Sequence, residues 1–561
     1  MESEWCLNTQ KKQKCRLATT AAGSIAALVI LIFLTSATSI GQTSEQEAKI
    51  ASARSDDTGD RAASSSDNTN AEVLQELERM HIRIQELESQ LRKQSFGATE
   101  VTVDSAQQLV AKPQQLVSTS AASAVKTQAE TEQTAATEKD AKAEPFAFAD
   151  WTWMNGNPRS KESPLDTKFF TPDIRFDAAY IYDFNHPKDD TIGGSAEVFR
   201  SQEFQLTQLG VGGDFHFDNV RGRLMTQFGM YSQTQPRNDA SPSRGQWGLD
   251  GAYRYLAEAY GGYHFNVNHG LNVDGGIFMS YIGLFSWYNF DNWAYQPSYV
   301  SSNTPFFFNG LRVQWFPTAK LKIESWLING WQSYGRFNSR PGLGFQIAYR
   351  PNGSITFVSN GYGIGADTFG NPDRIRYHSD TSVELKYYDH PDRFMDKAAF
   401  SLTGDIGCEH GGGVSCTGNT ANGPKQSFLG FMIYNRLWFF KDRYGLTLGG
   451  GKINNPGRYL VLIPPINGAT AASGTPYFTA NPGDPFKAWD ASATFDYMPS
   501  QYITFRWEFD HRAANVPYFS GRGGITPVGG NQGSPGSLID GFTPDLRKDE
   551  NRLNMAIMVK F

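Results

Sequence analysis

The chain has 561 residues, of which 39% are hydrophobic, 13% aromatic and only 19% charged, and 55 are glycine. The glycine content excludes a coiled coil throughout, and the aromatic content excludes a wholly disordered chain. A formal net charge of −6 gives no reason to expect nucleic acid as a partner. The negative mean hydropathy argues against several transmembrane helices. A large all-β protein, soluble or membrane-embedded, remains open.

Residues 1–39 have the layout of a secretory signal peptide, in which a basic region precedes an apolar core and a small-residue cleavage site. The basic residues are Lys11, Lys12, Lys14 and Arg16. The most apolar part spans residues 25–34, and cleavage is expected after Ser39. An uncleaved membrane anchor is the alternative, because the uncharged stretch 17–42 is just long enough to span a bilayer.

Beyond this signal the sequence contains only Cys408 and Cys416, which lie in a glycine-rich stretch. In an exported protein, two close cysteines in a loop predict one disulfide. Their spacing matches none of the common zinc patterns, so we expect no metal site here.

Residues 40–72 and 95–144 are polar and nearly free of aromatics, which predicts a disordered spacer and a disordered linker. Residues 73–94 between them repeat apolar residues at steps of 4 and 3, which predicts a short coiled coil. Its seam consists of Val73, Leu77, Met80, Ile84, Leu87 and Leu91. We expect this segment to order a homo-oligomer, either a dimer or a trimer; a solitary amphipathic helix is the alternative.

From residue 145 to residue 561, apolar residues recur at every second position. Ile503, Phe505 and Trp507, for example, alternate with polar neighbours. This pattern predicts about sixteen strands (about 14–18), including strands near 174–184, 204–217, 220–232 and 551–561. Long and short connections alternate between them, and the short ones carry Pro, Asn, Asp or Gly. That alternation is typical of an antiparallel transmembrane β-barrel of the bacterial outer membrane and has no reason to occur in a soluble sandwich. An even strand number places both ends of the barrel, and hence the spacer and coiled coil, on the periplasmic side.

The terminal strand ending in Phe561 resembles the closing strand of outer-membrane proteins. Residues 280–315 read SYIGLFSWYNFDNWAYQPSYVSSNTPFFFNGLRVQW, and FPTAKLKIESWLINGW follows them. These stretches resemble the β-barrel porin family described as OmpL-like, and the resemblance covers about residues 165–561. It implies a pore but no particular solute. The coiled coil is similar in plan to that of sugar-specific porins with an N-terminal helical extension.

In a barrel of this size, polar residues that alternate with lipid-facing ones line a water-filled channel. The pore-lining candidates are Arg175, Asp177, Asp183, Arg221, Arg223, Asp274, Arg312, Lys322, Glu324, Glu384, Lys386, Asp490, Arg506, Glu508 and Asp510. Both signs of charge occur together, so we expect weak charge selectivity. For each position, the alternative role is a salt bridge within the wall.

Residues 282–305 form the best candidate for a constriction loop, because aromatic residues crowd one connection. The candidates are Trp287, Tyr288, Phe290, Asp291, Trp293, Tyr295 and Tyr299. Aromatic faces stack on sugar rings and a carboxylate fixes orientation, which makes carbohydrate a candidate solute. An aromatic girdle at the membrane interface or packing within the loop are the alternatives.

We find no catalytic motif and predict neither an enzyme nor a cofactor. The sequence predicts an outer-membrane porin for passive, weakly selective diffusion of small hydrophilic solutes. The expected partners are the lipid bilayer, those solutes, further copies of the chain and peptidoglycan. An envelope-tethering or surface-display barrel, whose periplasmic stalk contacts the cell wall, is the alternative function.

Overall fold

A computed structural model describes residues 144–188, 190, 192, 198, 200–236, 239, 241, 247–336, 340–365, 373–456, 485–522 and 545–561. The predicted signal, spacer and coiled coil, and all of the predicted linker except its last residue, lie outside the described residues and stay predictions. Within the described part of the chain, no helix is long and apolar enough to cross a bilayer.

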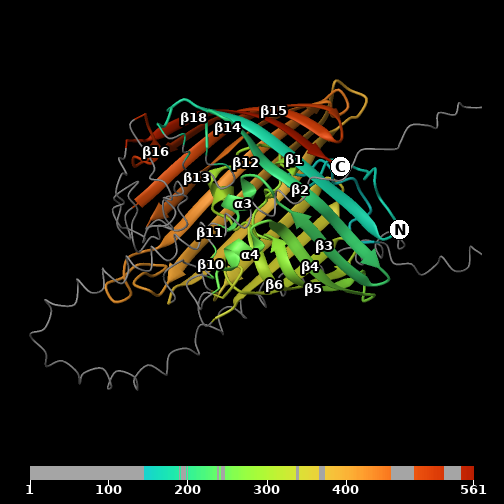
Figure 1. Ribbon diagram of the computed structural model, residues 1–561, viewed down its shortest axis with the longest axis horizontal. Coiled ribbons are helices and arrows are strands. Elements are labelled where there is room, and N and C mark those ends of the chain that lie inside the picture. Colours follow the sequence, from blue (N-terminus) through green and yellow to red (C-terminus); the bar gives the residue numbers. More distant parts are fainter. Residues whose placement is uncertain are drawn as a thin grey trace, which may run out of the picture. The chain divides into compact units, whose positions relative to one another are not determined.

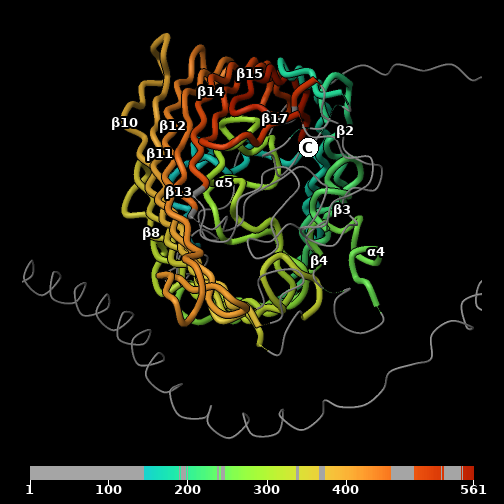
Figure 2. Tube along the Cα trace, turned by 90° about the vertical axis from the view of Figure 1, so that its left-hand side faces the viewer, coloured from blue at the N-terminus to red at the C-terminus, as the bar shows by residue number. Residues whose placement is uncertain are grey.

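Sixteen strands of the described chain form one closed antiparallel barrel, as the sequence predicts (Figures 1 and 2). They are β1 (Phe170–Asp183), β2 (Phe204–Phe217), β3 (Val220–Thr226), β4 (Leu256–Phe265), β5 (Leu271–Met279), β6 (Phe307–Thr318), β7 (Leu321–Ile328), β8 (Gly342–Asn352), β9 (Ile355–Gly363), β10 (Ile375–Asp389), β11 (Met395–His410), β12 (Ser427–Phe439), β13 (Tyr444–Pro456), β14 (Pro485–Ser500), β15 (Ile503–Ala514) and β18 (Asp549–Lys560). Two short strands, β16 (Phe519–Ser520) and β17 (Leu546–Arg547), pair with each other outside this sheet. The barrel closes where β1 pairs with β18, with Phe176 opposite Val559.

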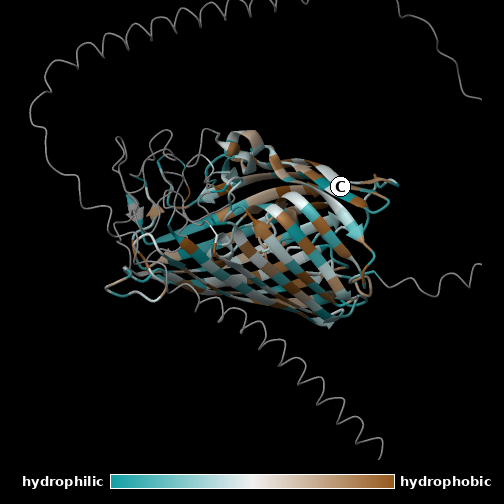
Figure 3. Cartoon of the chain, turned by 90° about the horizontal axis from the view of Figure 1, so that it is seen from below, coloured by the Kyte–Doolittle hydropathy of each residue, from teal (hydrophilic) through white to brown (hydrophobic). Residues whose placement is uncertain are grey.

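Hydrophobic and hydrophilic residues alternate along the barrel strands (Figure 3), and in β12 the apolar set faces outward. Leu429, Phe431 and Ile433 are 60%, 50% and 44% exposed, whereas the intervening Met432 and Tyr434 are buried inside the barrel. Large apolar side chains exposed on alternate positions of a closed sheet form the surface that hydrocarbon covers. The alternation in the sequence therefore arises from a lipid-facing side and a lumen-facing side.

Tight turns join the strands at one end of the barrel, for example at residues 218–219, 319–320 and 353–354, and longer connections join them at the other end. The C-terminus lies at the end opposite β16 (Figure 1). The predicted strand 220–232 is too long, because β3 ends at Thr226. Gly229 has a φ of +93°, and the chain then forms the helical turn α3 (Tyr231–Thr234). A second short helix, α4 (Leu249–Tyr253), precedes β4.

The barrel interior is not an open cylinder, because the connection between β5 and β6 folds into it. This connection contains the 3-10 turn η3 (Asn289–Asp291) and the helix α5 (Tyr299–Ser302). Figure 2 shows α5 within the ring of strands, and α5 contacts β12, β13 and β14. Residues 144–160, which precede β1, add Trp151, Trp153 and Met154 to the same buried cluster. The hydrophobic core therefore lies inside the barrel.

The lipid-facing assignment can be tested at Leu402, which is 41% exposed near the middle of β11. We expect Leu402→Arg to lower the free energy of unfolding by about 2–4 kcal/mol, because a cation near the bilayer midplane loses its hydration. Phe394, in the turn before β11, is 65% exposed, and Phe394→Arg should cost at most about 1 kcal/mol. Denaturant unfolding of the protein in lipid vesicles measures both, and equal costs would contradict a lipid-facing β11.

Candidate functional site

The candidate site is the space between the barrel wall and residues 280–306, which we call the inward loop. The loop leaves β5, crosses the lumen and returns to β6. Its helix α5 begins after Ser298, whose side chain accepts a hydrogen bond from Val300 N. Some backbone groups of the loop pair within it, as Asp291 N does with Tyr288 O, and charged side chains of the wall bind others.

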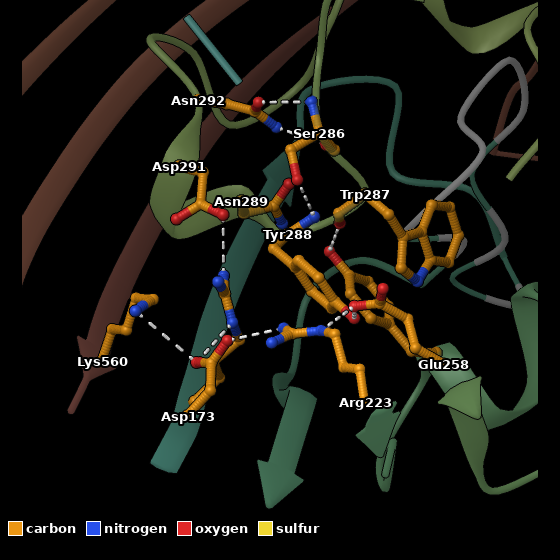
Figure 4. Close-up of polar contacts among 12 residues, drawn as sticks. Asp173, Arg223, Glu258, Ser286, Trp287, Tyr288, Asn289, Asp291, Asn292 and Lys560 are labelled. Atoms are coloured by element: carbon orange, nitrogen blue, oxygen red, sulfur yellow. Dashed lines mark hydrogen bonds and ion pairs between the residues drawn. The ribbon is translucent and has the colours of Figure 1, made fainter. Parts of the chain in front are cut away.

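Arg175 of β1 holds the first part of the inward loop. Its Nη1 donates to Asp291 Oδ2 at 2.9 Å, and its guanidinium lies 4.1 Å from the centroid of the Tyr288 ring. Asp173 accepts from Arg175 Nε at 2.9 Å and lies 3.6 Å from Lys560 Nζ (Figure 4). Burial raises the pKa of the Asp291 carboxyl, although Arg175 opposes that shift. Asp291 is thus a structural ion-pair partner of the wall.

Glu508 and Arg506 of β15 hold the middle of the inward loop. Glu508 accepts from Tyr295 N and from Gln296 N, each at 2.6 Å. Arg506 donates to Asn292 O at 2.7 Å. These charge-assisted bonds satisfy loop groups that would otherwise be buried without partners.

Asp177 and Asp490 hold the later part of the loop in the same way. Asp177 accepts from the Tyr295 hydroxyl at 3.1 Å. Asp490 accepts from Ser298 Oγ at 2.8 Å and from Tyr299 N at 3.0 Å. The neighbouring Asp510 contacts the wall itself, where it accepts from Asn554 Nδ2 at 2.5 Å. All of these wall residues are buried.

Three further arginines, which the sequence analysis missed, also donate to the inward loop. They are Arg436, to Trp293 O at 3.2 Å; Arg512, to Pro297 O at 2.8 Å; and Arg552, to Gln296 Oε1 at 3.0 Å. All three occupy lumen-facing positions of alternating strands, and this position in the pattern could have identified them from the sequence. The wall from β12 through β15 and β18 to β1 is therefore occupied by the loop.

Most of the predicted constriction aromatics are buried anchors of the inward loop. Trp293 packs edge-on against Trp438, with ring centroids 5.7 Å apart, and its Nε1 donates to Trp153 O. The Tyr288 hydroxyl donates to Glu258 at 2.8 Å, and Phe290 lies beneath Arg159. Tyr295 and Tyr299 are buried as well, where Tyr295 bonds to Glu508 and Asp177 and Tyr299 to Asp490.

Trp287 is the member of this aromatic set whose side chain borders a large open cavity. It stacks on Phe306 at 4.4 Å between ring centroids, and both residues line a cavity of about 290 Å³. The opposite side of this cavity is the wall of β6, β7 and β8, including Arg312, Glu324 and Gln346. We call it the upper cavity.

A second cavity of about 540 Å³, the lower cavity, shares Gly283, Leu284, Gln314, Lys322 and Gln346 with the upper one. It extends toward the tight-turn end, where residues such as Phe316 and Arg350 line it. The shared residues place the two cavities next to each other on the side of β3 to β10, and we call the pair the route.

Five of the predicted pore-lining residues line this route: Arg221, Arg312, Lys322, Glu324 and Glu384. Asp274 lies 2.8 Å from Arg312 and 3.4 Å from Arg221, and Lys322 lies 2.7 Å from Glu324.

Three of the remaining candidates lie elsewhere on the wall. Arg223 forms ion pairs with Asp173, Asp214 and Glu258. Asp183 is fully buried and accepts from Asn185 N at 2.8 Å. Lys386 pairs with Asp389 at 2.5 Å.

Residues 144–160 cross the tight-turn end of the lumen, and we call them the strap. Phe146 N donates to Ala319 O in one turn, and Arg159 donates to Ser500 O in another. Between these points, Asn155 Oδ1 accepts from Trp293 N at 2.7 Å. The sequence analysis assigned no separate role to this segment, although Phe146, Trp151 and Trp153 make it rich in aromatic residues.

At the rim formed by the long connections, the structure joins Cys408 of β11 to Cys416 in a disulfide. Nearby, Glu409 accepts from Arg376 Nη2 at 2.5 Å. In the described residues, no group of three or more His, Cys, Asp or Glu side chains is placed to hold a metal ion.

The comparison with protein families agrees with this barrel. A family model described as "Putative beta-barrel porin-2, OmpL-like" matches residues 176–561. Among solved structures, the chain is similar to the outer-membrane channel DcaP of Acinetobacter baumannii, with 13% identity, a TM-score of 0.39, and coverage of 70% of this chain and 96% of that one. It is also similar to OprB of Pseudomonas putida, with 12% identity, a TM-score of 0.40, and coverage of 70% of this chain and 94% of that one. The corresponding values for an anion-selective porin from Comamonas acidovorans are 11% identity, a TM-score of 0.39, and coverage of 70% of this chain and 99% of that one. No curated protein matches the chain.

Removing Glu508 tests whether the wall holds the inward loop. We expect Glu508→Ala to weaken the docking of the loop by about 1–3 kcal/mol for each of the two N–H groups left without an acceptor. The loop should then leave the wall part of the time, so single-channel conductance in planar bilayers should rise and fluctuate. Glu508→Gln, which keeps one acceptor oxygen, should show a smaller change, and Glu162→Ala, at an exposed site, should show none. Unchanged conductance in Glu508→Ala would contradict the anchoring role.

Proposed function

We propose, since the chain belongs to the OmpL-like β-barrel porin family, that it is an outer-membrane porin through which small hydrophilic solutes diffuse passively. The observation that carries this proposal is the pair of adjoining cavities, of about 290 and 540 Å³, between the inward loop and the wall of β6 to β8. A cavity lined by Gln314, Lys322 and Gln346 can hold water and polar solutes. The proposed activity is passage rather than a chemical reaction.

The proposed pore discriminates weakly by charge. The cations on the route face carboxylates at short distance, as in the pair Lys322 and Glu324 and in the group Arg312, Asp274 and Arg221. Paired charges leave a small net field for a passing ion. Small neutral and singly charged solutes should therefore pass at comparable rates.

Carbohydrate is a candidate solute for the upper cavity. Its lining includes the rings of Tyr281, Trp287 and Trp326, together with the amides of Gln314 and Gln346. Aromatic faces beside hydrogen-bonding amides suit the apolar and hydroxylated faces of a sugar ring. This part of the proposal rests on the lining of the cavity.

We further propose that the barrel lies in the outer membrane with its tight-turn end toward the periplasm, where the predicted coiled coil would join copies of the chain. The apolar outer face of the wall and the family support the membrane location. A homo-oligomer follows from the heptad pattern of residues 73–94.

The porin proposal predicts a steady ionic current from the purified protein in planar bilayers, together with osmotic swelling of proteoliposomes in small sugars. Deleting residues 42–144 should leave the conductance of each barrel within about twofold, because the route lies between the inward loop and strands of residues 220–389. The absence of any open-state current from folded protein would contradict the proposal.

Trp287 provides a test of carbohydrate contact. Trp287→Ala should lower the swelling rate in glucose relative to the acyclic polyol sorbitol about 2- to 10-fold, because about 0.5–1.5 kcal/mol of contact between the sugar and the aromatic lining of the upper cavity is lost. The matched control is Trp247→Ala, since Trp247 is 78% exposed and does not line the cavity. An unchanged glucose-to-sorbitol ratio in Trp287→Ala would contradict sugar stacking at this position.

A further inference from the structure

The lower cavity carries a pair of opposite charges that are not used to hold the inward loop. Four lysine, arginine or glutamate side chains line it: Arg221, Lys322, Arg350 and Glu384. Arg221 is near Asp274 and Lys322 is paired with Glu324. In the described part of the chain, no ion pair within 4.0 Å involves Arg350 or Glu384.

Arg350 is held in place by the strap rather than by an acceptor. Its guanidinium carbon lies 4.5 Å from the centroid of the Phe146 ring and 4.5 Å from that of the Trp151 ring. Its Nε is buried and has no hydrogen-bond partner among the described residues. Two aromatic contacts fix the guanidinium but leave its donors unfilled, and a planar guanidinium suits a carboxylate.

Glu384 presents an unfilled acceptor to the same cavity. Its Oε1 accepts from Asn155 N of the strap at 2.8 Å. The side chain is fully buried, and its Oε2 has no hydrogen-bond partner among the described residues. A buried carboxylate oxygen without a donor is costly, so the position suits an occupant that supplies N–H or O–H groups.

We propose that the lower cavity is a binding site for a small zwitterionic solute of the α-amino-acid type. Its carboxylate lies against Arg350 and its ammonium against Glu384. An anion would meet the carboxylate of Glu384 and a cation would meet the guanidinium of Arg350, whereas a zwitterion complements both. A volume of about 540 Å³ accommodates such a solute with several waters. This site rests on the proposed porin function, because the solute reaches it along the pore.

The test measures how solutes reduce the ionic current of the full-length protein in planar bilayers. The probes are L-serine, glycolate, ethanolammonium and erythritol, which have similar sizes but carry both charges, one charge or none. We expect L-serine to half-block the current at a concentration about tenfold below that of each of the other three solutes. This is the effect expected when L-serine makes one more hydrogen bond to a charged group than they do. Equal half-blocking concentrations for L-serine and erythritol would overturn the proposal, while the current itself would still support a porin.

Two substitutions test whether Glu384 binds the ammonium of the solute and Arg350 binds its carboxylate. Glu384→Gln should remove the preference for L-serine over glycolate, and Arg350→Gln should remove the preference over ethanolammonium. Glu162→Gln and Arg393→Gln, at exposed sites outside the cavity, should preserve both preferences. A β-sheet circular dichroism spectrum and a cooperative denaturant-unfolding transition in lipid vesicles establish that each variant is folded. With folding so established, preferences that persist in both cavity variants would overturn the site.

Discussion

The structure depends on one constraint, which is that a sheet spanning a bilayer must pair every backbone N–H and C=O group because hydrocarbon offers no partner. The pairing of β1 with β18 meets this constraint by closing the sheet. Closure with sixteen strands leaves an interior too wide for wall side chains to fill. The inward loop and the strap fill part of that interior, and the adjoining cavities lie beside them.

The placement of the charged wall residues determines the side of the barrel interior on which the inward loop docks. Buried carboxylates and guanidinium groups on β1, β12, β14, β15 and β18 bind the backbone of the inward loop, as Glu508 does with two consecutive N–H groups. Such charges are costly to bury unless they are paired and hydrogen-bonded, so they favour one docked position of the loop. On the side of β6 to β8, charges such as Lys322 and Glu324 pair with each other instead and border open space. The inward loop therefore packs against one side of the wall, and the cavities lie along the other side.

Alternation of apolar and polar residues predicted the strands, because a lipid face and a lumen face impose a period of two on every strand. The alternation of long and short connections then predicted the barrel. The residue pattern failed after Thr226, where Gly229 turns the chain into α3. It also could not separate loop anchors from route-lining charges. Arg175 and Asp291, or Glu508 and Tyr295, meet across more than a hundred residues, and no local pattern encodes such pairs. The strap was missed because its tryptophans are spaced by two as in a strand although it contains no strand, and its role depends on contacts with Trp293 and Glu384.

The central claim is that solutes pass between the inward loop and β6 to β8, not along β18. The most direct measurement uses single cysteines in a chain whose Cys6 and Cys15 are replaced by serine, probed with a charged methanethiosulfonate during current recording. Gln346→Cys lies on both cavities, whereas Asn554→Cys lies on the fully buried inner face of β18. The account predicts that the reagent reduces the current of Gln346→Cys and leaves that of Asn554→Cys unchanged. A block of Asn554→Cys with no effect on Gln346→Cys would contradict it.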